Sequence, residues 1–81
     1  MEKSELLKII GSNVKRIRHS KGMTQVDLAG NVIESIDTTN ISRIESGRTN
    51  PTIFTLYRIA EALEVPVSEL TKTETPTKDE S

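Results

Sequence analysis

The sequence lacks the side chains on which most catalytic and metal-binding sites depend. It has no cysteine and no tryptophan, and only one histidine, one tyrosine and one phenylalanine. Without thiols, disulfide bonds and thiolate metal sites are excluded. His19 stands alone, and the sequence has no pattern of paired carboxylates, metal ligands, activated nucleophiles or phosphate-binding loops. We therefore expect no enzymatic activity, no metal and no cofactor.

Long apolar stretches are also missing. None approaches the roughly 20 residues of a membrane span, and only a short apolar stretch precedes Lys8, which is not typical of a signal peptide. Together with the absence of cysteine, this predicts a cytoplasmic protein. A chain of 81 residues forms one domain with a small core, and because such a domain is marginally stable alone, dimerisation would help it.

Charge is unevenly distributed along the chain. Residues 1–50 carry eight basic and six acidic side chains, a net charge of +2, whereas residues 51–81 carry three basic and six acidic ones, a net charge of −3. The total of −1 argues against a polyanionic partner. The local field at a binding surface matters more than the total, however, and the two parts differ in sign.

Apolar periodicity and cap residues predict an all-α fold of five helices. They span residues 4–21, 24–32, 38–46, 53–63 and 66–70. From residue 71 to residue 81 the chain has no apolar side chain. Such a segment buries too little surface to offset the entropy of ordering it. We therefore predict one domain over residues 1–70 and a disordered polar tail over residues 71–81.

The first predicted helix has a continuous apolar face. Its apolar residues recur at spacings of four, four and three, which is typical of one side of a helix. These residues are Leu6, Ile10, Val14 and Ile17. Ser4 is the predicted N-cap and Gly22 the predicted stop. Gly11 weakens this helix, since an interior glycine costs roughly 1 kcal/mol relative to alanine.

The next two helices are short and begin at cap residues. Thr24 caps the second helix, and Asp27, three residues on, makes an imperfect capping box. Asp37 is the predicted N-cap of the third helix, on which Ile41 and Ile44 face inward at a spacing of three.

The last two helices follow a loop that ends at Pro51. Thr52 is the predicted N-cap of the fourth helix, and Pro66 fits the first turn of the fifth, where its missing N–H is not needed. The apolar residues of the fourth helix share one face. They are Ile53, Leu56, Ile59, Ala60 and Leu63.

A characteristic set of residues occurs in order along these helices. The set comprises Gln25, LA at residues 28–29, ISRIESG at 41–47, NP at 50–51, Leu56, and IAEAL at 59–63. In this order and spacing the chain resembles the helix-turn-helix family of the Cro and phage-repressor type, also called the XRE family. The resemblance covers residues 10–70. A lone helix-turn-helix pattern is weakly specific, whereas the whole ordered set is strongly so.

The resemblance implies a lambda-repressor-like five-helix bundle that binds double-stranded DNA. The second and third helices would form the helix-turn-helix, with the third, over residues 38–46, in the major groove. The chain departs from the family in one respect: between Ala29 and Glu45 it has about two residues more than the usual pattern. The extra length falls near Ile33 and Glu34 and affects the angle between the two helices.

Side chains on the outer face of the third helix are the candidates for reading bases. Arg43 is the first, because a guanidinium can bond guanine O6 and N7 together; the alternative is a solvated surface arginine. Thr38 and Thr39, at the start of the helix, could reach base edges or a thymine methyl group. Both threonines could equally serve only to start the helix.

Small polar side chains near helix starts are the candidates for contacts with the DNA backbone. Gln25 matches a family position that contacts the backbone and braces the third helix, and Asn50 could equally be a turn former before Pro51. The further candidates are Asn40, Ser42, Arg48, Thr49, Asn50 and Thr52. The basic side chains of Lys15 and Arg16 are interpreted as a solvated helix face.

The resemblance also implies a structural ion pair. The positions matching Arg18 and Glu45 join the first helix to the third in this family. Glu45 follows Ile44 and precedes the stop at Gly47, so it sits beside the core. We therefore assign this pair to structure, because a free carboxylate at Glu45 would repel a phosphate.

Phe54 and Tyr57 lie partly off the apolar face of the fourth helix. They either pack at the edge of the core or belong to a partner surface together with Val65, Val67 and Leu70. Family members often dimerise through the fifth helix and its surroundings. A twofold dimer would place two recognition helices roughly 34 Å apart on a near-palindromic operator.

The leading hypothesis is a small homodimeric transcriptional regulator whose biochemical act is sequence-specific DNA binding. The alternative is a protein-binding role for the same fold, as an antitoxin that holds a toxin or as an adaptor, with the acidic tail or the fifth helix as the contact. The two are compatible, since antitoxins of this family also repress.

Overall fold

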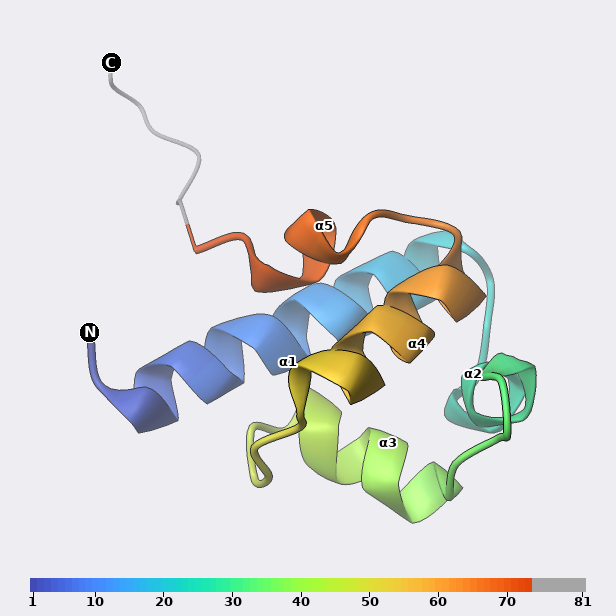
Figure 1. The fold of residues 1–81 in the computed structure, drawn as a ribbon, viewed down its shortest axis with the longest axis horizontal. Helices are drawn as coiled ribbons and strands as arrows, with labels where there is room; N and C mark the ends of the chain where they lie inside the picture. The colour runs from blue at the N-terminus through green and yellow to red at the C-terminus, as the bar shows by residue number, and fades with distance from the viewer. Residues whose placement is uncertain (74–81) are drawn as a thin grey trace.

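Five α-helices follow one another in the computed structural model, which describes residues 1–73 (Figure 1). Their bounds are α1 Lys3–Ser20, α2 Gln25–Asn31, α3 Thr38–Glu45, α4 Ile53–Leu63 and α5 Val67–Thr71. No strand occurs among the described residues, so the predicted all-α, five-helix fold is confirmed. The predicted tail lies outside the described residues from position 74 on, and Thr71 belongs to α5 instead.

Each predicted helix boundary lies within one residue of the observed one, and two predicted caps are made. The hydroxyl of Thr24 accepts a hydrogen bond from the Asp27 amide while the Asp27 carboxylate accepts one from the Thr24 amide, which completes the capping box. Thr52 accepts a hydrogen bond from the Thr55 amide in the same way.

Three predicted helix starts differ in detail from the structure. Ser4 is not a cap: α1 begins at Lys3, and the N-cap is Glu2, whose side chain makes no capping bond. Asp37 is the N-cap of α3, but its side chain makes no capping bond either. Pro66 is the extended N-cap of α5 rather than part of its first turn. The first turn of α3 is therefore held by packing, such as that of the buried Ile41, more than by a cap.

The long helix α1 is the centre of the packing. Figure 1 shows α1 between α3 and α5, and it contacts both; α2 packs on α3 and α4, and α4 packs on α5. The predicted inner faces form one core, which excludes the partly buried Leu6 and the exposed Ile53. The buried apolar residues are Ile10, Val14, Ile17, Leu28, Ala29, Val32, Ile41, Ile44, Leu56, Ile59, Ala60, Leu63 and Leu70.

The described helices include none that combines the length and the apolar character of a membrane span. The longest, α1, is amphipathic, with a buried side formed by residues such as Val14 and Ile17 and an exposed side that carries Lys15 and Arg16.

Gly11 lies where α1 passes closest to the end of α3. A Cβ atom at this position would overlap the carbonyl oxygen of Ile44 and lie 2.5 Å from that of Glu45. The backbones of the two helices touch here, and only glycine permits it. Gly11 lowers the helix propensity of α1, but this loss is offset because the glycine lets α1 approach α3 closely.

Substituting Gly11 by alanine tests this contact. We expect Gly11→Ala to lower the free energy of unfolding by about 1–3 kcal/mol through overpacking, although alanine is the better helix former. Gly30→Ala is the matched control: it is also helical, but nothing lies within 4 Å of its added Cβ, so it should stabilise by about 0.5–1 kcal/mol. Urea unfolding measures both, and equal stabilisation by the two changes would contradict the close approach.

Candidate nucleic-acid interface

One face of α3 is buried and the other is open to solvent. Ile41 and Ile44 are in the core, whereas Thr39 and Arg43 are exposed and Thr38 is half-buried. Among the described residues, the guanidinium of Arg43 takes part in no hydrogen bond or ion pair. The predicted base-reading residues are thus exposed or half-buried, on a helix that lies at the edge of the molecule (Figure 1).

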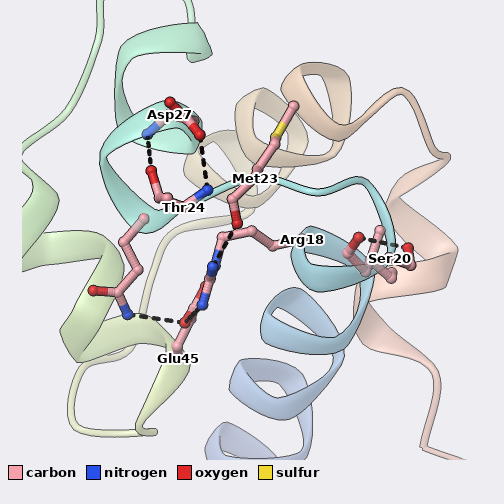
Figure 2. A network of polar contacts seen from close by, with 8 residues as sticks. Arg18, Ser20, Met23, Thr24, Asp27 and Glu45 are labelled. Atoms are coloured by element: carbon pink, nitrogen blue, oxygen red, sulfur yellow. Dashed lines mark hydrogen bonds and ion pairs between the residues drawn. The ribbon is translucent and has the colours of Figure 1, made fainter.

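The end of α3 is tied to α1 by a buried ion pair. The Nε of Arg18 donates to Oε2 of Glu45 at 2.6 Å and its Nη2 donates to Oε1 at 3.0 Å, with 7% and 3% of the two side chains exposed. The remaining nitrogen, Nη1, donates to the Met23 carbonyl at 2.7 Å. Figure 2 shows the two planar groups facing each other. The ion pair that the sequence predicted is therefore present.

The first residue of α2 also bonds to this ion pair. The side-chain amide of Gln25 donates to Oε1 of Glu45 at 3.0 Å, so α1, α2 and α3 meet at a single carboxylate. The hydrogen bond to Glu45 raises the pKa of Arg18 above its ordinary value, against the opposing effect of burial. Since the charge of Glu45 is neutralised inside the protein, it does not oppose a polyanion at the surface.

The capping box fixes the start of α2, next to Gln25. Two hydrogen bonds lower the pKa of the Asp27 carboxyl below its ordinary value. The bond from the Thr24 amide has the larger effect, and the bond with the Thr24 hydroxyl has the smaller. The stability that ionised Asp27 contributes is therefore fully present above the ordinary pKa of an aspartate. It is lost as the pH falls through the lowered pKa of Asp27. At neutral pH the orientation of the first turn of α2 is secured.

Two hollows bring candidate contact residues together. Gln25 and Ser42 line one at the junction of α1, α2 and α3, together with Lys15, Glu45 and Ser46. Lys15, interpreted from the sequence as a solvated side chain, thus stands beside two predicted backbone contacts, a proximity that only the fold reveals. The other hollow lies at the start of α3 and is lined by Ile36, Asp37, Thr39, Asn40 and Arg43.

The remaining candidates follow α3 in the loop that leads to α4. Arg48 and Asn50 are exposed and Thr49 is half-buried; the Nε of Arg48 donates to the Ser46 hydroxyl at 3.1 Å. The hydroxyl of Thr52 caps α4 and also donates to the Thr55 hydroxyl at 3.1 Å. The loop can leave α3 at this point because Gly47 has a φ of +75°. For all of these residues, contact with DNA stays a prediction.

The predicted partner surface is only partly correct. Leu70 is fully buried in the core, because α5 turns it toward α1 and α4, so its placement at the surface is wrong. Val65 and Val67 are half-buried. Phe54 and Tyr57 are 64% and 54% exposed, which excludes the alternative that they pack at the core edge.

Two further apolar side chains are exposed beside these aromatics. Ile53 is 72% exposed and Ile33, in the turn before α3, is 59% exposed. Ile33, Phe54 and Tyr57 border one hollow, and Ile53 lies one turn before Tyr57 on α4. We call Ile33, Ile53, Phe54 and Tyr57 the apolar patch. Sequence reasoning assigned Ile53 to the core because it continues the spacing of the α4 face.

The helix-turn-helix family model matches residues 14–70. The chain belongs to the helix-turn-helix family. It is 39% identical over 75 residues to the uncharacterized HTH-type transcriptional regulator y4dJ of Sinorhizobium fredii, covering 93% of this chain and 91% of that protein. Over 71 residues it is 35% identical to the immunity repressor protein of Bacillus phage phi105, covering 88% of this chain and 48% of that protein.

A solved structure of a relative extends the comparison. The restriction-modification controller protein C.Esp1396I, as a tetramer in complex with its natural 35 base-pair operator, is 39% identical with a TM-score of 0.70, covering 83% of this chain and 96% of that chain. The resemblance to the Cro and phage-repressor type is thereby confirmed, and so is the predicted class of DNA-binding transcriptional regulator.

The buried ion pair should dominate the stability of this interface. We expect Glu45→Gln to lower the free energy of unfolding by about 3–5 kcal/mol, because it leaves the Arg18 guanidinium buried and unpaired. The matched control is Glu69→Gln, which breaks the exposed pair with Lys72, joined at 3.5 Å, and should cost less than about 1 kcal/mol. Chemical unfolding measures the free energy of unfolding of both variants. Equal losses would show that the buried pair contributes no more to stability than the exposed one.

Proposed function

We propose that the chain regulates transcription by placing α3 in the major groove of a specific operator. The observation that carries this proposal is the outer face of α3, where Arg43 and Thr39 are exposed next to the half-buried Thr38. The guanidinium of Arg43 would bond a guanine edge, and the threonines would contact base edges or a thymine methyl group. The family membership and the operator complex of the controller protein support this role.

Groups around α3 would hold it in register on the phosphates. Gln25 and Ser42 share a hollow with Lys15, so an amide, a hydroxyl and an ammonium group converge beside the start of α2. Such donors position a protein on the duplex without reading its sequence. Further backbone contacts would come from Asn40 on α3 and from Arg48, Thr49, Asn50 and Thr52 after it.

The relatives are named as transcription regulators, and this supports two broader proposals. We infer that the chain acts by binding and has no catalytic activity of its own, and that it works in the cytoplasm, where bacterial and phage operators are found. The exposed apolar patch would also suit a partner protein such as a toxin. Copurification of such a partner, with loss of DNA binding in the complex, would favour the antitoxin reading.

Selection of binding sites from random DNA tests the proposal directly. We expect the wild-type chain to select two half-sites related by a twofold axis, one helical turn apart. Arg43→Ala should relax the preference at one base pair of each half-site, with a loss of about 1–3 kcal/mol in discrimination. Arg16→Ala is the matched control, since Arg16 is an exposed arginine of α1 outside the candidate interface. An Arg43→Ala variant with unchanged affinity and preference would refute base reading by this residue.

We propose that the regulator binds as a homodimer through the apolar patch, with Val65 and Val67 at its margin. Four large apolar side chains exposed together are unusual for a monomer of this size. A twofold interface presents the same surface from both protomers, which the patch allows. The tetrameric assembly of the controller protein on its operator supports an oligomer.

Replacing an aromatic of the patch tests the interface. We expect Phe54→Asn to raise the dimer dissociation constant by roughly tenfold or more, since a buried aromatic contributes several times RT to association. Val26→Asn is the matched control, because Val26 is also exposed, at 65%, but lies on α2 outside the patch. Sedimentation equilibrium gives both constants. A dimer weakened equally by both changes, or by neither, would place the interface elsewhere.

A further inference from the structure

The turn between α2 and α3 differs in burial along its length. Residues 32–37 form it. Its ends are anchored: Val32 is buried and its amide donates to the Leu28 carbonyl, while the Ile36 amide donates to the Ala29 carbonyl at 3.3 Å. Between these anchors, Ile33 and Glu34 are exposed, and Glu34 has a φ of +62°. The middle of the turn, residues 33–35, thus has no buried residue of its own.

A single side chain from α4 holds this middle part. The Nε and Nη2 of Arg58 donate to the Ile33 carbonyl at 3.1 and 2.7 Å, and Nη2 lies 3.5 Å from the Glu34 carbonyl. The guanidinium carbon of Arg58 lies 5.6 Å from the centre of the Phe54 ring. The guanidinium is therefore fixed by a ring on its own helix while it bonds the turn.

Arg58 stands on a rigid support. Its neighbours on α4, Ile59 and Ala60, are buried in the core, and α4 packs on α2 and α5. A planar guanidinium that bonds one carbonyl through two nitrogens fixes direction as well as distance. The bonds from Arg58 thereby fix the position of the turn, and with it the start of α3, relative to the core.

We propose that Arg58 is a positioning residue for DNA recognition. By clamping this turn to α4, it sets the orientation of α3 and so brings Thr38, Thr39 and Arg43 to the base edges while Gln25 holds a phosphate. This inference rests on the proposed function, since it concerns the geometry in which α3 reads DNA. It assigns to Arg58 no contact with DNA itself.

The substitution that tests the clamp is Arg58→Met, which keeps the length of the side chain and removes its donors. Operator affinity should fall about tenfold, the order expected when one base contact is lost. Affinity for unrelated DNA and the slope of operator binding against salt concentration should stay unchanged, because no phosphate contact is removed. Arg58→Lys should recover only part of the loss, since an ammonium group cannot reproduce the two-nitrogen bond.

Amide hydrogen exchange gives a readout that does not involve DNA. In Arg58→Met the Ile36 amide should exchange about tenfold faster, because the turn opens more often. The Val32 amide, bonded within the end of α2, should keep its rate and so serves as the internal control. Arg16→Met, which removes an arginine remote from the turn, should change neither rate. All measurements are made on the full chain at a temperature where every variant is folded.

The possible outcomes separate the clamp from its alternatives. A salt slope reduced by about one, with weaker binding to all DNA, would make Arg58 a phosphate contact and overturn the proposal. Full operator affinity in Arg58→Met, with wild-type binding intact, would also overturn it. A wild-type chain that selects no sequence would instead refute the proposed function, and this failure is distinguishable because it precedes any substitution.

Discussion

The orientation of α3 depends first on the ion pair between Arg18 and Glu45. Three elements meet at the Glu45 carboxylate: α1 through Arg18, α2 through Gln25, and α3, which carries it. At the same place Gly11 lets the backbones of α1 and α3 touch. A side-chain bond and a backbone contact thus fix one end of α3 together. Because breaking a buried pair is far costlier than its net contribution suggests, this end of the helix has a single well-defined position.

The other end of α3 is held differently. Asp37 makes no capping bond, and the turn before it contains exposed residues, so orientation there depends on the bonds from Arg58 to the turn carbonyls. Arg18 of α1 therefore holds the last residue of α3, and Arg58 of α4 holds the turn that leads into its first. The residues between them, Thr39 and Arg43, stay exposed. A rigid helix with an open outer face is what base recognition requires, since contacts to base edges tolerate little displacement.

The sequence predicted the helices and much of the interface because these depend on local pattern. Caps such as Thr24 and the spacing of Ile41 and Ile44 act within one or two turns of chain. The features that escaped prediction, such as the role of Arg58, depend on residues brought together only by folding. Leu70 was misassigned because an apolar residue in a short terminal helix has no periodicity to reveal which side is buried. The Arg18–Glu45 pair was predicted only through the family resemblance, not from spacing.

A net charge of −1 is compatible with a polyanionic ligand because of where the acids lie. Glu45, at the end of α3, is neutralised by Arg18 and buried. The acidic residues of α4 and α5, such as Glu61 and Glu69, follow the α3 segment in the part of the chain with the negative balance. Lys15, Arg43 and Arg48 remain near the candidate contacts. One exposed acid, Asp37, lines the same hollow as Arg43, so bases outnumber acids beside the candidate contacts, and at physiological salt such near charges count most because more distant ones are screened.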